Sequence, residues 1–138
     1  MEKLLVIIEK SKCGFCAYHK GNWNFSVEAK SIDQVKRMVN FEVSLYLFNK
    51  LKNIHCCSFN RDMYPTVNYQ YNVNKLLDEV RPLIKLKTLA DFAGLTSVCL
   101  SYYLGGQRKV SEKVFLNLVN AVHKITFTLN EIVGTKQS

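Results

Sequence analysis

Long apolar runs are missing from this sequence, which argues against a membrane-spanning helix. A span needs roughly 18–20 consecutive apolar residues, and no run in the chain reaches that length. The apolar segment Leu4 to Ile8 has charged residues on both sides and is shorter than the apolar core of a signal peptide. We therefore expect a cytoplasmic protein with no membrane partner.

The even cysteine count of a disulfide framework and a complete zinc-binding motif are also lacking. Five cysteines are an odd number, and a reducing compartment disfavours a disulfide framework. Cys13, Cys16 and His19, with the later run His55-Cys56-Cys57, leave a zinc site open as an alternative. However, adjacent cysteines on a strand point to opposite faces, and no second C-x2-C pair follows. We expect ordinary cysteines, no metal and no cofactor.

Clustered carboxylates are scarce as well, which disfavours an enzyme of the nuclease type. An RNase-H-type nuclease needs several carboxylates around Mg²⁺. The first half offers Glu9, Glu28, Asp33 and Glu42. Each is more simply a solvated surface residue, and Asp33 suits the first turn of a helix. We predict a protein that is not an enzyme, with a metal-dependent nuclease as the alternative.

Positive charge and apolar residues are abundant. Nineteen Lys plus Arg against eleven Asp plus Glu give a formal net charge of +8, which favours polyanionic partners such as DNA or RNA. The cations are spread along both halves, so a basic patch must be built by folding. Hydrophobic residues make up 48% of the chain, enough for one ordinary domain or two very small ones.

The first half predicts three antiparallel strands and a helix. The continuous apolar run Leu4 to Ile8 suits a strand covered on both faces, and Phe15 to His19 returns after a turn at Gly14. Trp23 to Ala29 alternates as a third strand. Trp23 and Tyr18 suggest core packing, with an aromatic contact site for a partner as the alternative.

Ser31 is typical of a helix N-cap, and a helix of about four turns should follow it. Its expected buried stripe recurs at steps of three and four residues: Ile32, Val35, Met38, Val39, Val43, Tyr46 and Leu47. The fold class is α+β, with a β-β-β-α domain over residues 1–66. Residues 54–59 and 67–71 are candidates for further strands.

The second half, residues 67–138, predicts an all-helical domain. One helix covers Val73 to Val80 and ends before Pro82. Three more are expected over Thr88–Ala93, Thr96–Leu104 and Ser111–Thr126. The middle two have the pattern of a helix-turn-helix, in which two short helices cross closely around a tight turn.

Small and apolar residues occupy the positions at which a helix-turn-helix requires them. Ala90 allows the close crossing, Gly94 tolerates a positive φ, and Leu95 with Leu100 fills the space between the helices. Either Thr96 or Ser97 can cap the second helix. A plain helical hairpin without DNA, acting as a protein-interaction module, is the alternative.

The outward face of the second helix and the loop after it are the expected DNA contacts. Hydroxyls and a valine on that face would read base edges, while the loop would contact phosphates. The helical face carries no Arg, Asn or Gln for bidentate base reading, so we expect modest specificity per module. The predicted DNA-binding residues are Thr96, Ser97, Val98, Ser101, Tyr102, Gln107, Arg108 and Lys109.

Together, the two halves resemble the HicB antitoxins of bacterial toxin–antitoxin pairs. In the first half the similar stretch covers residues 4–9 through 14–18, the third strand, 31–35 and 44–47. In the second half it runs from Leu83 through Ser111. The resemblance covers most of the chain apart from residues 49–66. One departure is the loop between the second and third strands, where Lys20-Gly21-Asn22 replaces a longer loop resembling Pro-Asp-Leu-Pro-Gly-Cys.

The resemblance implies a degenerate RNase-H-like domain that binds and masks a small HicA ribonuclease toxin. It also implies oligomers, dimers or tetramers, that repress their own operon by placing paired helix-turn-helix modules on palindromic double-stranded DNA. Because the loop is short, a HicB-like DNA-binding protein without a toxin partner is the alternative.

Overall fold

The structure is a computed structural model that describes residues 3–19, 25–51 and 65–134. The chain divides into two compact units, Met1–Gln70 and Tyr71–Ser138. The division falls after Gln70 rather than after residue 66, because the segment that follows residue 65 is a strand of the first unit's sheet.

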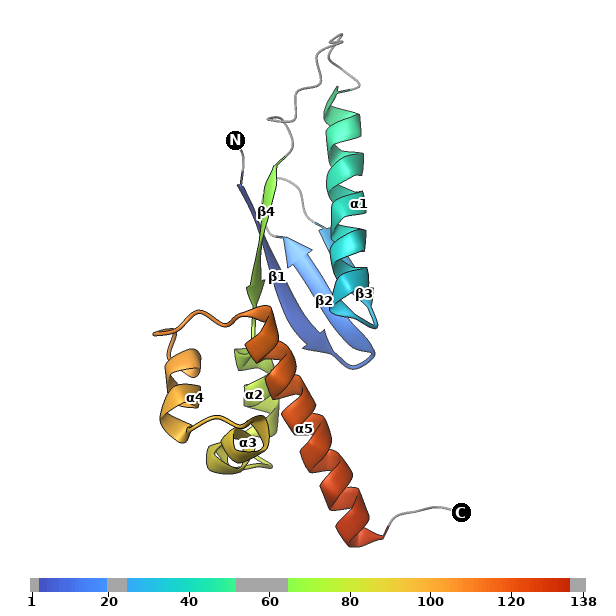
Figure 1. The fold of residues 1–138 in the computed structure, drawn as a ribbon. Coiled ribbons are helices and arrows are strands. Elements are labelled where there is room, and N and C mark those ends of the chain that lie inside the picture. Colours follow the sequence, from blue (N-terminus) through green and yellow to red (C-terminus); the bar gives the residue numbers. More distant parts are fainter. Residues whose placement is uncertain (1–2, 20–24, 52–64, 135–138) are drawn as a thin grey trace. The chain divides into compact units, whose positions relative to one another are not determined.

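The first unit is built on a four-stranded sheet with the order β3-β2-β1-β4. The strands are β1 (Lys3–Ser11), β2 (Gly14–His19), β3 (Phe25–Ala29) and β4 (Thr66–Tyr71). The three antiparallel strands predicted from the sequence are confirmed: Ala17 pairs with Ile8 on one side and Val27 on the other. The prediction of a wholly antiparallel sheet is wrong in one respect, because β4 lies beside β1 and runs in the same direction (Figure 1).

Helix α1 (Ile32–Leu51) supplies the crossover that brings the chain from β3 toward β4, and it covers one face of the sheet (Figure 1). It begins as predicted, with the Gln34 backbone N–H donating to Ser31 Oγ at 3.2 Å. Alternate residues of β1 and one stripe of α1 form the core of this unit, namely Leu4, Val6, Ile8, Ile32, Val35, Val39, Val43 and Leu47.

Two details of this core differ from the sequence-based expectation. Leu5 is half exposed, so β1 buries alternate residues over its first half, and only near its end are two adjacent residues, Ile8 and Glu9, both buried. Met38 is exposed on α1 and does not join the buried stripe, because a step of three from Val35 carries it beyond the edge of the packed face. The candidate strand at residues 54–59 lies outside the described residues.

The described part of the second unit, up to residue 134, contains four helices: α2 (Asn74–Val80), α3 (Leu86–Ala93), α4 (Ser97–Leu104) and α5 (Glu112–Val133). Its core brings together fully buried side chains from all four, and the Phe115 ring at the start of α5 contacts the Tyr71 ring in a tilted arrangement with a centroid distance of 5.5 Å. The largest of these buried residues are Leu77, Leu89, Leu100, Phe115 and Leu118.

Helix α5 is longer than predicted. No proline or glycine interrupts it between Ser111, whose Oγ accepts from the Val114 backbone N–H at 3.2 Å, and Gly134, which ends it with φ +67°. Residues 126–133, beyond the last buried residue Ile125, are all exposed and include the apolar side chains of Leu129, Ile132 and Val133. Among the described residues, no helix is both long and apolar enough to cross a membrane.

The hairpin between β1 and β2 generates a first prediction about stability. A Cβ atom on Gly14 would collide with the backbone carbonyl oxygen of Ala29 on β3. Gly14→Ala should therefore lower the free energy of unfolding by about 1–3 kcal/mol, as overpacking commonly does. Urea denaturation followed by circular dichroism measures this. Lys12→Ala, an exposed position in the same hairpin, is the control and should change little; equal stability of the two variants would contradict the prediction.

Candidate nucleic-acid interface

The turn between α3 and α4 has the geometry that the sequence pattern predicted. Gly94 adopts the left-handed conformation, with φ 71° and ψ 26°. The backbone N–H of Leu95 donates to Ala90 O at 2.9 Å, and that of Gly94 donates to Asp91 O at 3.2 Å. This pair of bonds is a Schellman motif, which satisfies carbonyls at the end of α3 and reverses the chain direction at once.

The start of α4 is fixed by a side-chain cap. The Thr96 backbone is extended, and its Oγ1 accepts a hydrogen bond from the Cys99 backbone N–H at 3.0 Å. The sequence left Thr96 and Ser97 open as caps, and the structure selects Thr96. A capping side chain is commonly worth about 1 kcal/mol, which matters for a helix of only eight residues.

A contact from α5 holds the end of α3, and sequence reasoning missed it. The side-chain Nδ2 of Asn117 donates to the backbone carbonyl of Ala93 at 2.7 Å. Ala90 and Leu100 are fully buried, as the close crossing of the two helices requires. The backbone around the turn is therefore anchored by local bonds and by a helix that begins 18 residues after Gly94, at Glu112.

The outward face of α4 is open to solvent. Only Leu100 is buried in this helix, while Val98 is 61% exposed and Tyr102 is 42% exposed. Ser101 Oγ donates to the backbone carbonyl of Ser97 at 3.0 Å. All eight residues predicted to contact DNA are exposed: Thr96, Ser97, Val98, Ser101, Tyr102, Gln107, Arg108 and Lys109.

Arg108 lies against α4, where the sequence pattern did not place it. Its guanidinium carbon is 5.6 Å from the centroid of the Tyr102 ring, and Nη1 lies 3.5 Å from Cys99 Sγ. The Arg108 backbone N–H also donates to Tyr102 O at 3.2 Å. The loop after α4 therefore turns back and brings a positive charge to a helix that has no charged residue of its own. The helix itself carries no Arg, Asn or Gln, as the sequence predicted, and the arginine beside it comes from the loop.

The remaining loop residues behave differently from Arg108. The Gln107 side chain folds over Gly105, since a Cβ atom at Gly105 would collide with Gln107 Oε1. The Gln107 amide is thus held close to the C-terminus of α4, while Lys109 is exposed.

The carboxylates considered for a nuclease are not brought together. Glu9 on β1 and Glu28 on β3 are both register partners of Cys16 on β2, so the two carboxylates lie on the same face of the sheet. Asp33 and Glu42 lie on α1, which packs on the opposite face. Burial raises the pKa of Tyr18, and the adjacent charge of Glu9, to which the Tyr18 hydroxyl donates a hydrogen bond, raises it further. Glu9 is therefore engaged in a structural contact with Tyr18.

The candidate zinc ligands are also dispersed where the structure describes them. Cys13 lies exposed in the hairpin turn, and His19 contacts the Leu5 carbonyl through Nδ1 at 2.9 Å and stacks on Phe25. No group of three or more His, Cys, Asp or Glu side chains that could hold a metal ion occurs within residues 3–19, 25–51 and 65–134. Residues 55–57, and Trp23, lie outside the described residues.

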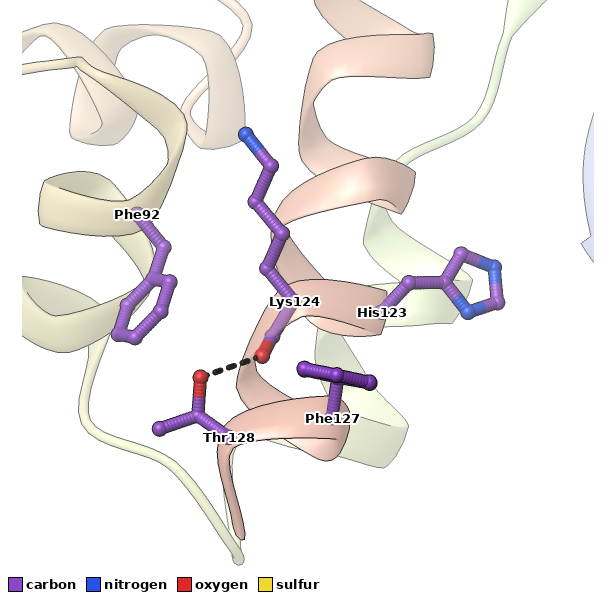
Figure 2. A pocket seen from close by; sticks show the side chains of 5 residues that line it. All are labelled: Phe92, His123, Lys124, Phe127 and Thr128. Carbon is purple, nitrogen blue, oxygen red and sulfur yellow. Dashed lines mark hydrogen bonds between the residues drawn. The ribbon is translucent and has the colours of Figure 1, made fainter. Parts of the chain in front are cut away.

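A shallow groove of about 500 Å³ lies between α3 and α5, and sequence reasoning did not anticipate it (Figure 2). Phe92 borders it from α3, and the Thr128 hydroxyl on α5 donates to the Lys124 carbonyl at 2.9 Å. His123 is exposed at this groove. Two phenylalanine rings make part of the lining apolar, and a lysine makes one edge basic. The lining residues are Phe92, His123, Lys124, Phe127 and Thr128.

Comparison of the chain with protein-family models, with curated proteins and with solved structures gave no match in any of the three. The interface described above therefore stands on its own geometry.

The left-handed turn generates a second prediction. A Cβ atom at Gly94 would meet nothing within 4 Å, so its substitution costs only backbone strain. Gly94→Ala should destabilise the chain by about 1–2 kcal/mol, and Gly94→Asn should cost less because asparagine visits this conformation more readily. Thermal unfolding of the two variants measures the order. Alanine as stable as glycine here would mean that the turn does not hold a positive φ in solution.

Proposed function

We propose that the chain is a DNA-binding transcriptional regulator of the HicB antitoxin type, which represses its own operon through the helix-turn-helix formed by α3 and α4. The observation that carries the proposal is the arrangement of α4. Its ends are fixed by the Thr96 cap and the following loop, its inner side is held by Leu100, and its outer side is solvent-exposed with Arg108 beside it.

The position of α4 suits insertion into a major groove. In a helix-turn-helix the second helix enters the groove and presents its N-terminal residues to base edges. The N-terminus of a helix also favours nearby phosphate groups, because its backbone N–H groups point outward and its dipole is positive there. No acidic residue occupies the first turn of α4 to oppose this.

Individual side chains on α4 gain specific roles from their contacts. Because the Ser101 hydroxyl donates its proton to Ser97 O, it remains free to accept a hydrogen bond. An acceptor at this place fits the exocyclic amino group of adenine or cytosine. Val98 presents an apolar surface of the kind that contacts a thymine methyl group.

Arg108 provides the positive charge that α4 itself lacks. Stacking on Tyr102 limits the freedom of its side chain, which lowers the entropy lost when it binds an anion. We assign Arg108, with Gln107 and Lys109, to phosphate contacts beside the groove, and Ser97, Val98, Ser101 and Tyr102 to base contacts. Thr96 sets the start of the helix and flanks the same phosphates.

The remaining parts of the proposal rest on the family resemblance. They are masking of a HicA-like toxin by the first unit, action in the cytoplasm, and a palindromic operator bound by a dimer or tetramer. The proposal assigns no catalytic residue and no metal or cofactor. A HicB-like protein that binds DNA without a toxin partner is compatible with the same interface.

DNA binding is the third prediction. Purified protein should bind a labelled fragment of its own upstream region, and the affinity should fall as salt rises, because phosphate contacts release counterions. Arg108→Ala should weaken binding about equally for all sequences and reduce the salt slope by about one, as expected for the loss of one phosphate contact. Fluorescence anisotropy at several salt concentrations measures both.

Two further variants make this experiment specific. Tyr102→Ala removes a base-reading ring and the support of Arg108, so it should weaken binding as well. Arg81→Ala removes an exposed cation at the end of α2 and should leave binding near the wild-type value. Equal binding by the wild type, Arg108→Ala and Tyr102→Ala would reject the assigned residues, and no salt-dependent retention at all would favour a protein-interaction module.

A further inference from the structure

Helix α1 carries a second apolar stripe that the described part of its unit does not cover. Among the described side chains of the helix, four large apolar ones are exposed: Met38 is 40% exposed, Phe41 63%, Leu45 42% and Phe48 67%. We name these four residues the outer seam. They lie on the side of α1 opposite Val35, Val39 and Val43, which are fully buried.

The outer seam cannot be buried by its own sheet. Because α1 packs on β2 and β3 through its inner stripe, the opposite face of the helix points away from them. The four side chains run for about 15 Å along the helix, at a rise of about 1.5 Å per residue. A contiguous exposed apolar stripe of this kind marks an interaction surface more often than scattered surface residues do.

The spacing of the outer seam is that of a helix–helix contact. Steps of three, four and three residues separate Met38, Phe41, Leu45 and Phe48, which is the a and d pattern of two helices that pack along a common line. On this heptad, Arg37 takes a g position and Glu42 takes an e position, five residues later. In a parallel pair, a g residue lies beside the e residue five positions later on the partner helix.

The flanking charges favour a second copy of this chain in parallel orientation. Arg37 would lie beside the partner's Glu42, and two-fold symmetry would repeat the contact on the other flank. In an antiparallel pair centred on this seam, the two copies of Glu42 would lie close together and repel each other. The charges are thus self-complementary in one orientation only.

We propose that the outer seam of α1 is a homodimer interface, in which the α1 helices of two copies pack in parallel around a two-fold axis. Met38, Phe41, Leu45 and Phe48 would each meet the same residue of the partner subunit. The interface would supply the pairing that a two-module repressor needs. It does not depend on DNA binding, since its observations all lie in the first unit.

The strength of this dimer follows from its size. An autonomous coiled coil needs three to four heptads, and the seam spans about one and a half. However, the sheet already orders α1, so dimerisation does not incur the cost of forming the helix. Interfaces below about 1,200 Å² are typical of reversible association. We therefore expect a monomer–dimer equilibrium that shifts with protein concentration.

Sedimentation velocity of the full chain without DNA tests the interface, which separates its failure from failure of the proposed function. The wild type should move from a 15.9 kDa monomer toward a dimer as its concentration rises. Phe41→Glu and Phe48→Glu should remain monomeric under the same conditions. Leu83→Glu, at an 83% exposed leucine in the second unit, is the matched control and should dimerise like the wild type. Circular dichroism verifies that every variant is folded.

Charge reversal tests the orientation. Arg37→Glu and Glu42→Arg should each weaken the dimer by several fold, because each puts like charges together across the interface, and the double variant should restore it. A wild type that stays monomeric, a Phe41→Glu variant that dimerises normally, or a Leu83→Glu variant that loses the dimer equally would overturn the interface. Failure of the double variant to recover would overturn the parallel arrangement proposed here.

Discussion

The positive φ of Gly94 is the constraint on which the second unit depends. Two helices of eight residues each are too short to be stable alone. The Schellman bonds at Gly94 fix where α3 ends, the Thr96 cap fixes where α4 begins, and these two points determine the angle at which Leu100 reaches the core. The hydrogen bond from Asn117 then holds the same turn against α5. The exposed face of α4 is a consequence of this arrangement rather than a separate feature.

How far the sequence predicted the structure depends on whether a feature is local. Gly94, Ser31 and Ser111 act on backbone atoms within a few residues, so the turn and the helix starts were predictable. The position of Arg108 was not, because it depends on a loop that returns to α4 through a cation–π contact. The position of β4 beside β1 was equally unpredictable from the sequence, since the partner of a strand is set by the whole sheet.

Helix α1 illustrates a different limit. Apolar residues lie on two opposite faces of this helix, and the sequence pattern does not separate them. Met38 was therefore assigned to the wrong face, and Phe41 and Phe48 were overlooked. Only the burial of Val35, Val39 and Val43 separates the stripe that packs on the sheet from the one that does not. The carboxylates were expected to be solvated surface residues, which holds for the exposed Glu28 and Asp33 but is wrong for Glu9, which is buried on the sheet.

The uneven burial of α5 has a consequence for local stability. From Phe115 to Ile125 the helix shares the core of its unit, so exposing its amide groups to exchange with solvent requires breaking that core. Residues 126–133 are exposed all round, and within the described part of their unit they are held by backbone hydrogen bonds and by side-chain contacts such as that of Thr128. A single continuous helix therefore contains two cooperative segments, and its final turns can open and close without unfolding α3 and α4.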